Sequence, residues 1–295
     1  MSERMFVATR KGLFTFQRNT TGWWQTGEQF LGTPISSVLH DPRSNAVYAA
    51  LNHGHFGVKL HRSDDDGATW DEITCPAYPA KPEGIEDVEP MRQRPIPWNV
   101  EMIWALEAGA SADEVWCGTI PGGLFQSRDR GESWVLNRSL WDHPKRKVWF
   151  GGGYDFPGIH SICVDPRNSQ HITVGVSCGG VWQSKNSGEN WTVASRGMKA
   201  DYMPPDQADD PHTQDPHLLV QSPANPDHFW TQHHCGVFRS TDNSQSWQTV
   251  TGLAPSSFGF AVAVHPQDAE TAWFAPAISD AMRYPVDGKF VITKT

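Results

Sequence analysis

The sequence has too little basic charge for a protein that binds nucleic acid. Its 24 Lys and Arg residues stand against 33 Asp and Glu residues, and the formal net charge is −9. Binding to a polyanion such as DNA requires a basic face. We therefore expect no nucleic-acid partner. Charged residues of both signs are scarce as well, at 19% of the chain against an average of about 25%.

Long apolar runs are also missing. The sequence has no run of about 18 apolar residues, which is the length that a helix needs to cross a bilayer. Its first seven residues contain Glu3 and Arg4 and lack the apolar core of a signal peptide. The five cysteines are an odd number without a Cys-x-x-Cys pair, which favours buried, reduced thiols over a disulfide framework. These absences predict a soluble cytoplasmic protein with no membrane partner.

The sequence contains no long periodic Ala/Glu/Lys/Leu stretches of the kind that form helices. Instead it holds 26 Gly, 22 Pro and 14 Trp. This composition favours many short strands joined by tight turns, and it predicts an all-β fold.

One segment with the pattern Ser-x-Asp/Asn-x-Gly/Ser-x-x-Trp occurs four times. Its tryptophans are 64, 57 and 56 positions apart. In each copy we expect the Asp or Asn to cap its own turn, the Gly to supply a positive φ, and the Trp to anchor the turn against a core. The expected structural residues are Ser63, Asp65, Gly67, Trp70, Asp129, Gly131, Trp134, Asn186, Gly188, Trp191, Asp242 and Trp247. The segment resembles the Asp-box, or BNR, repeat of sialidase-like β-propellers.

Each repeat extends into a longer unit of four expected strands, which is the pattern of a propeller blade. Five units begin near residues 36, 100, 159, 216 and 259, and residues 5–25 form a partial closing blade. We therefore expect residues 1–295 to form a single β-propeller domain of four-stranded antiparallel blades. The resemblance implies six or seven blades, and we expect the last blade to be incomplete at the C-terminus, where the fifth unit stops before its Asp-box. An open seam there would expose strand edges and favour a homo-oligomer.

The long connections 74–99, 137–158 and 194–215 fall on one expected face of the blades, and long loops on a rigid scaffold often build sites. Histidines cluster on the same face. They are His53, His55, His160, His217, His233 and His234. Imidazoles bind transition metals or act as acids and bases near pH 7. We expect His160, His217 and His234 as candidate ligands of a divalent transition metal; each histidine could instead hydrogen-bond the loop backbone.

Further candidates lie in the same loops or lead into the strands. The expected catalytic residues are His160, His217, Asp155 and Glu101. The expected ligand-binding residues are His53, His55, Trp149, Tyr154, Tyr202, His233 and Arg10. The glycine-rich segment 149–155 could close over a ligand or serve as a packing loop.

The resemblance does not extend to sialidase chemistry. A sialidase needs three arginines on a carboxylate and a Tyr nucleophile with a Glu partner. Here Tyr154 and Tyr202 have no evident Glu beside them, and Arg10 is the clearest arginine at the expected mouth. The chain is also similar to a bacterial group of BNR-repeat proteins of glycosyl hydrolase type, through residues 54–61, 149–155, 201–205 and 232–234. That likeness implies no particular activity.

Three hypotheses follow. The first is a His-rich pocket that binds a small polar ligand, with metal-assisted hydrolase or lyase chemistry. The second is a glycoside hydrolase-like enzyme without sialidase activity that uses a carboxylate pair such as Glu101 and Asp155, in which case a glycan is the partner. The third is a non-enzymatic scaffold that binds a protein or peptide across the propeller face.

Overall fold

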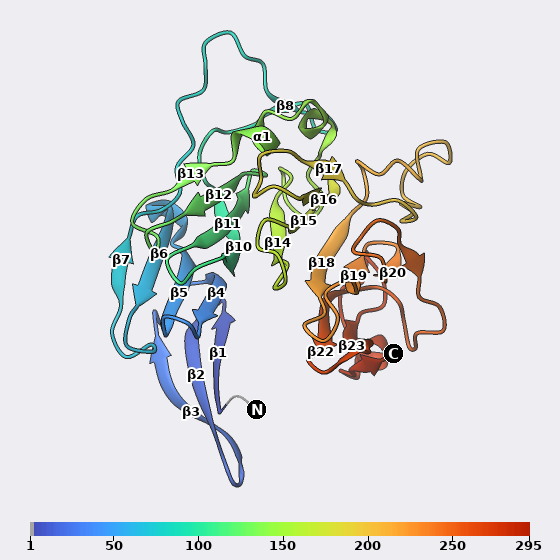
Figure 1. The fold of residues 1–295 in the computed structure, drawn as a ribbon. Coiled ribbons are helices and arrows are strands. Elements are labelled where there is room, and N and C mark those ends of the chain that lie inside the picture. The colour runs from blue at the N-terminus through green and yellow to red at the C-terminus, as the bar shows by residue number, and fades with distance from the viewer. Residues whose placement is uncertain (1–2) are drawn as a thin grey trace. The chain divides into compact units, whose positions relative to one another are not determined.

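The computed structural model describes residues 3–295 and is nearly all β. Six antiparallel sheets follow one another along the chain, and in each sheet the strands are paired in chain order (Figure 1). Four of these sheets have four strands, and the first and last have three. They are the blades of a β-propeller, so the predicted fold class is confirmed.

The chain divides into two compact units. The first unit comprises the residues up to Lys81 together with Pro97–Leu136. Its first blade consists of β1 (Arg4–Thr9), β2 (Gly12–Asn19) and β3 (Gly22–Gln29). Its second blade consists of β4 (Ile35–Asp41), β5 (Ala46–Asn52), β6 (Val58–Ser63) and β7 (Asp71–Ile73), with a 3₁₀ helix at Gly54–Phe56. Its third blade consists of β10 (Met102–Ala108), β11 (Val115–Ile120), β12 (Leu124–Ser127) and β13 (Val135–Leu136).

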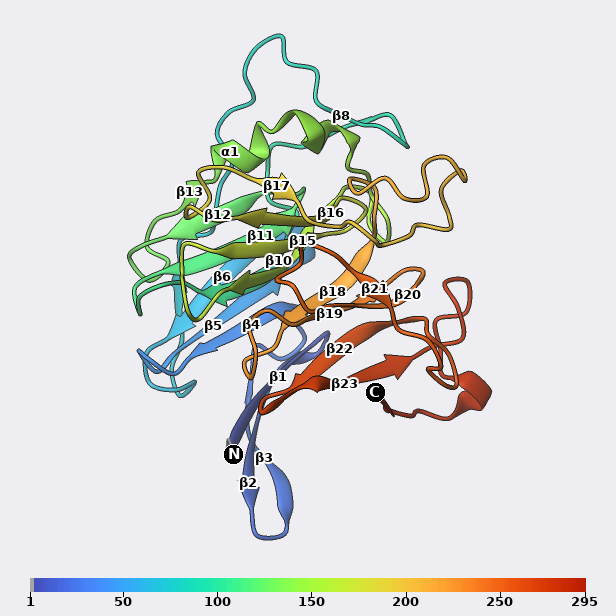
Figure 2. The same cartoon turned by 45° about the vertical axis from the view of Figure 1, so that its right-hand side comes forward.

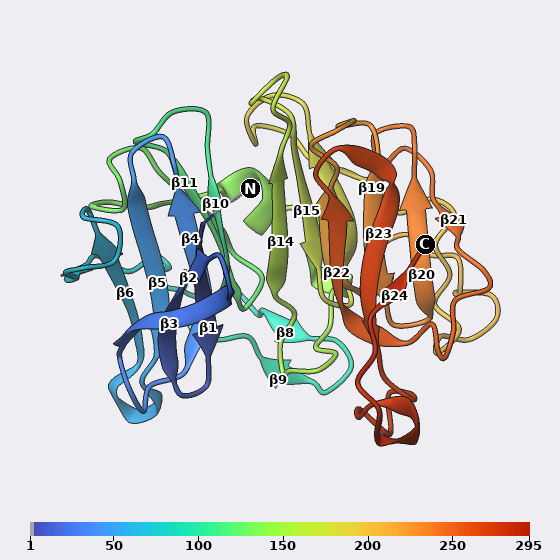
Figure 3. The same ribbon diagram turned by 90° about the horizontal axis from the view of Figure 1, so that it is seen from below.

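The second unit comprises Pro82–Ile96 and Asn137–Thr295. It starts with a small hairpin, β8 (Val88–Glu89) and β9 (Arg94–Pro95), which is seen clearly in Figure 3. Helix α1 (Arg138–Trp141) and the 3₁₀ helix Pro144–Val148 precede the fourth blade, β14 (Ile159–Val164), β15 (Ile172–Val176), β16 (Gly180–Ser184) and β17 (Thr192–Val193). The fifth blade consists of β18 (Pro216–Gln221), β19 (Phe229–His233), β20 (Gly236–Ser240) and β21 (Gln248–Thr249). The sixth consists of β22 (Gly259–His265), β23 (Asp268–Pro276) and β24 (Thr293–Lys294), with a 3₁₀ helix at Val286–Gly288. The prediction of one domain over residues 1–295 stays a prediction.

Figure 2 shows the successive sheets of the second unit. Apolar contacts between these blades form the core of the unit. The second strand of the fourth and fifth blades is buried along its whole length, because both of its faces pack against neighbouring elements. Phe229 and Trp247 belong to one cluster, and Trp230 and Phe274 belong to the next. This packing gives the second unit a rigid scaffold.

The four repeated Ser-x-Asp/Asn-x-Gly/Ser-x-x-Trp segments form turns with the same hydrogen bonds. In the first, Ser63 Oγ accepts the N–H of Gly67 at 2.7 Å, and Asp65 Oδ1 accepts the N–H of Thr69 at 2.8 Å. The equivalent Ser and Asp/Asn bonds recur in the turns after β12, β16 and β20. Gly67 has φ +88°, whereas in the fourth turn a serine, Ser244, adopts φ +57°. Hydrogen bonds from the Ser and Asp/Asn side chains thus stabilise all four turns, and membership of the BNR family stays a prediction.

The first strand of each four-stranded blade carries a β-bulge near its start. The register skips one residue in β4, β10, β14 and β18. The skipped residues are Ser36, Trp104, His160 and His217. A bulge redirects the side chain of the extra residue, so the fold itself places a histidine at this position in two successive blades.

All five cysteines are free thiols, and Cys117 and Cys178 are buried. No helix of the described residues 3–295 is long and apolar enough to cross a membrane.

Candidate functional site

A buried carboxylate, Asp215, lies at the start of the fifth blade. It directly precedes β18, and its backbone is held on both sides: its N–H points at His233 Nε2 at 3.0 Å, and its carbonyl accepts the N–H of His234 at 2.9 Å. Asp215 Oδ1 accepts the backbone N–H of Cys178 at 3.0 Å. These bonds fix the carboxylate so that its second oxygen, Oδ2, is presented to two histidines.

His217 and His234 reach Asp215 from different elements. His217 is the bulged residue of β18, and His234 lies in the turn between β19 and β20. His217 Nε2 and His234 Nδ1 each lie 3.5 Å from Asp215 Oδ2. The ligand atoms of the three residues all lie within 4.8 Å of one another. Two imidazoles and a carboxylate are a donor set that binds Zn²⁺ and other transition metals, and three protein ligands leave coordination positions open for water or substrate.

A hydrogen bond to the backbone fixes the orientation of the His217 ring. Its Nδ1–H donates to the carbonyl of Gly259 at 2.7 Å, and this bond turns Nε2 toward Asp215 Oδ2 at 3.5 Å. Metal-binding histidines commonly donate their second nitrogen in this way to a backbone carbonyl. The local arrangement therefore fits a metal ligand.

Aromatic side chains pack against the rings of His217 and His234. The ring of Phe260 in β22 stacks on His217 at 4.7 Å with an interplanar angle of 15°, and Phe258 contacts both histidines edge-on. Tyr202 packs edge-on against His234 at 5.0 Å, while its hydroxyl donates to the carbonyl of Thr213 at 2.6 Å. Phe260 and Tyr202 are 42% and 38% exposed, so the site has an accessible aromatic rim.

The site stabilises charge on Asp215. Burial alone would favour the neutral acid, but hydrogen bonds to His217 and His234 hold the pKa of Asp215 well below its usual range. The hydrogen bond to Asp215 raises the pKa of His234. A carboxylate that stays ionised between two imidazoles is prepared to bind a cation.

His160 and His233 have different surroundings. His160 is buried in β14 with Nδ1 2.7 Å from Ser161 Oγ, and burial lowers its pKa to about 4. His233 is fully buried between the backbone N–H groups of Asp215 and Cys235, and burial lowers its pKa to about 3. Both rings are neutral at pH 7. The structure thus brings together His217 and His234 of the expected ligands, with Asp215 in the place given to His160.

A loop of three consecutive glycines, residues 151–153, lies against one side of the site. We call it the glycine loop. A Cβ atom on Gly152 would lie 2.8 Å from Cys178 Sγ and 3.4 Å from Asp215 Oδ2. The β8–β9 hairpin holds this loop. Arg92 Nη1 donates to the carbonyl of Gly151 at 2.6 Å, and the Gly151 N–H donates to the buried Glu89 at 3.3 Å.

The other candidates from the sequence are not members of this cluster. In the second unit, Trp149 is fully buried against Trp182, Tyr154 is 48% exposed, and Asp155 pairs with Arg94 at 2.6 Å. The candidates in the first unit are Arg10 between β1 and β2, His53 and His55 around the 3₁₀ helix Gly54–Phe56, and Glu101 just before β10. Their roles as site residues stay predictions.

Asp215 is the functional candidate that sequence reasoning missed. The signal was the run Asp215-Pro216-His217, in which a carboxylate stands two positions before a histidine at the start of a strand. In the fold, His217 is the bulged residue of β18, and its Nε2 lies 3.5 Å from Asp215 Oδ2.

No family model matches the chain. The chain is 29% identical over 171 residues to the oligoxyloglucan-reducing end-specific xyloglucanase of Emericella nidulans, a match that covers 56% of this chain and 18% of that enzyme. This identity over so small a share of the enzyme does not establish its family for the chain.

Solved structures of GH74 enzymes share the fold. The enzyme of Niastella koreensis superposes with a TM-score of 0.61 at 16% identity, over 93% of this chain and 39% of that one. The GH74 xyloglucanase of Xanthomonas campestris gives a TM-score of 0.55 at 15% identity, over 93% and 49%. The chain therefore spans less than half the length of each. The fold is that of glycoside hydrolase propellers, and the relation to sialidase-like BNR proteins stays a prediction.

Proposed function

We propose that the chain binds a divalent transition metal ion on Asp215, His217 and His234 and uses it in hydrolase- or lyase-type chemistry on a small polar ligand. One observation carries the proposal. A buried carboxylate oxygen lies 3.5 Å from a ring nitrogen of each of two histidines, and His217 is oriented for ligation by the Gly259 carbonyl.

A metal ion at this position would lower the pKa of a bound water and polarise a ligand oxygen. The chain's own residues supply the rest. Asp215 provides the negative charge, the Cys178 amide and the Gly259 carbonyl keep the ligands in place, and Phe258 shields the two rings from water. Side chains that are fixed before binding lose little conformational entropy when the ion binds.

Metal content measured by mass spectrometry on untagged protein tests the proposal. Wild type is loaded with Zn²⁺ or Mn²⁺, desalted and compared with the double variant His217→Ala/His234→Ala. The variant His265→Ala is the matched control, because His265 lies at the far end of β22, where it accepts the Gln267 N–H and contacts the ring of Trp273. We expect close to one ion per chain in wild type and control and little in the double variant. Metal-free wild type after loading would refute the site.

A second candidate function is glycoside hydrolysis, favoured by the 29% identity to a xyloglucanase. That reaction needs two carboxyl groups about 5–10 Å apart, and no metal. The test is release of sugar from xyloglucan oligosaccharides in the presence of a chelator. Chelator-resistant release that is lost in Glu101→Gln or Asp155→Asn would support this candidate, and release that is unaffected by either substitution would exclude these carboxylates.

A further inference from the structure

We propose that a cleft in the second blade binds the phosphate group of a small molecule. Thr33, Asn52 and His53 supply the polar groups of this site, and Arg10 and Lys11 supply its positive charge. The site belongs to the first unit and uses no residue of the proposed metal centre. It therefore does not rest on that proposal.

An open cleft of about 480 Å³ lies between the start of β4 and the turn that follows β5. Sites for small molecules commonly enclose about 300–1,000 Å³. Asn52 Oδ1 accepts the Gly54 N–H at 3.2 Å. Among residues 3–295, by contrast, the half-buried Asn52 Nδ2, Thr33 Oγ1 and His53 ring have no hydrogen-bond partner, so all three are available to a ligand. The cleft is lined by Gly32, Thr33, Pro34, Asn52, His53 and Gly54.

This cleft occupies the place in the second blade that the candidate metal ligands occupy in the fifth. In the second blade, the Asn52 N–H donates to the Pro34 carbonyl at 2.9 Å. In the fifth blade, the His234 N–H donates to the Asp215 carbonyl at 2.9 Å. Both contacts lie just before the bulge in the first strand of the blade. The same backbone position thus carries a carboxylate in one blade and an uncharged proline in the other.

Positive charge surrounds the cleft. Its walls and the adjoining turn comprise residues 9–12, 30–35 and 51–58, which contain Arg10, Lys11 and two histidines but no acidic residue. The turn contacts the wall directly, because the Gly32 N–H donates to the Lys11 carbonyl at 3.0 Å. Arg10 and Lys11 are exposed, and neither forms an ion pair with any residue that the structure describes.

One acidic side chain, Glu72, interacts electrostatically with His53, but its charge is already balanced. Lys59 Nζ lies 2.6 Å from Glu72 Oε1. The charges of Arg10 and Lys11 therefore remain for a ligand. A phosphate monoester carries a charge of about −1.5 to −2 at pH 7 and three strong acceptor oxygens. It matches two positive charges and three polar groups better than a carboxylate, which carries one charge.

Isothermal titration calorimetry on metal-free, desalted protein tests the inference. The ligands are glycerol phosphate, inorganic phosphate, glycerate and glycerol. The double variant Arg10→Gln/Lys11→Gln removes both charges. Asn52→Asp keeps an oxygen for the Gly54 N–H but replaces the amide donor by a negative charge. The control Arg128→Gln removes an exposed arginine from the turn after β12 in the same unit, and urea unfolding shows whether each variant is folded.

We expect wild type and the Arg128→Gln control to bind glycerol phosphate at least about tenfold more tightly than glycerate, and glycerol not to bind. The double variant and Asn52→Asp should each bind phosphate about tenfold or more weakly than wild type while remaining folded. Tighter binding of the ester than of inorganic phosphate assigns an ester to the site, and equal binding assigns free phosphate. Three results would overturn the inference: wild type that binds neither, glycerate that binds as tightly, or phosphate binding that either variant leaves unchanged.

Discussion

Asp215 keeps its charge in a place where burial alone would neutralise it. Its carboxylate is only a few per cent exposed, and its pKa is nevertheless held low by His217 and His234. A buried charge is tolerated when partners compensate it, and it becomes costly when one partner is removed. At the residue scale, the two histidines compensate the buried charge of Asp215. In the function that we propose, a bound metal ion would compensate it instead.

Glu107, at the end of β10, gives a prediction on pH. Burial raises its pKa to about 7, above the ordinary value of 4.5. The folded state therefore holds a proton that the unfolded state releases, and stability falls as pH rises from about 4.5 to about 7. Glu107→Gln removes this dependence. We expect the variant to gain about 1–3 kcal/mol of unfolding free energy at pH 8 and almost nothing at pH 4.5. Urea unfolding at both pH values measures it; an equal gain at both would contradict the raised pKa.

The histidines show what residue identity could and could not predict. Their clustering in turns and at strand starts could be predicted, because repeat spacing fixes where strands begin. Which rings would meet could not be predicted, because it depends on bulges and on backbone N–H groups. His217 points at Asp215, whereas His160 and His233 are buried as neutral rings.

At the element scale, the glycine loop gives a test with a built-in control. A methyl group on Gly152 would meet Cys178 Sγ at 2.8 Å, while one on Gly153 would meet nothing within 4 Å. Gly152→Ala must displace the loop or Cys178, whose amide holds Asp215. We expect a loss of metal affinity of about 10–100-fold in Gly152→Ala and less than about twofold in Gly153→Ala. Equal affinities in the two variants would mean that the loop does not support the site.

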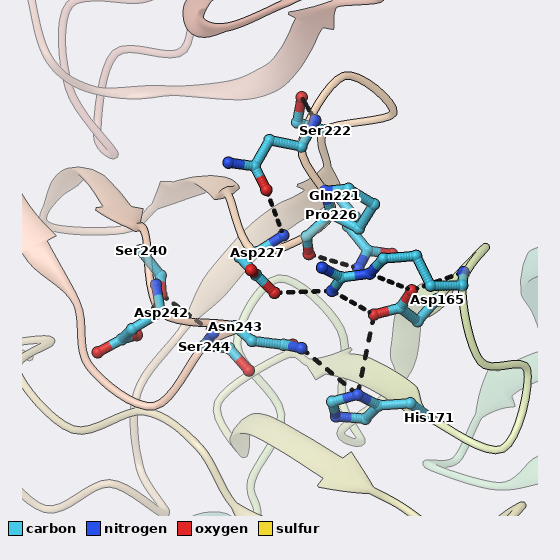
Figure 4. A network of polar contacts seen from close by, with 12 residues as sticks. Asp165, His171, Gln221, Ser222, Pro226, Asp227, Ser240, Asp242, Asn243 and Ser244 are labelled. Atoms are coloured by element: carbon cyan, nitrogen blue, oxygen red, sulfur yellow. Dashed lines mark hydrogen bonds and ion pairs between the residues drawn. The ribbon is translucent and has the colours of Figure 1, made fainter.

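The turns at the other ends of the strands carry stability instead. Figure 4 shows the turn after β14, where Asp165 lies beside His171 and Asp227 of the fifth blade. Asp165 is buried and accepts the N–H and Nε–H of Arg167 at 2.8 and 3.0 Å, and Arg167 also pairs with the exposed Asp227 at 2.7 Å.

Removing the two carboxylates should therefore have unequal effects. Asp165→Ala leaves the turn's donors without their acceptor and should cost about 1–3 kcal/mol of unfolding free energy. Asp227→Ala removes only an exposed ion pair and should cost at most about 1 kcal/mol. Thermal or urea unfolding of both variants measures the difference. A larger loss of unfolding free energy in Asp227→Ala would show that the Arg167–Asp227 ion pair between the two blades contributes more to stability than the turn at Asp165.

At the scale of the whole molecule, the blades could be predicted from the sequence because their turns repeat. Four Ser, Asp/Asn and Trp positions recur and form turns with the same hydrogen bonds, and the strands follow from them. The carboxylate in the site could not be predicted in this way. Asp215 belongs to no repeat, and its role depends on three backbone segments that meet only in the folded second unit.

The propeller fold is shared with GH74 enzymes, but a shared fold does not transfer an activity. The chemistry that we propose rests on the chain's own cluster of two histidines and a carboxylate, and it differs from that of the carboxylate pair of a glycosidase.

The most direct measurement is anomalous diffraction at the metal absorption edge, from crystals of Zn²⁺-loaded protein. Our account predicts one strong peak within about 2.0–2.2 Å of Asp215 Oδ2, His217 Nε2 and His234 Nδ1, and its loss in Asp215→Asn crystals. A difference map with no anomalous peak at these atoms, or with the ion bound elsewhere in the second unit, would contradict it.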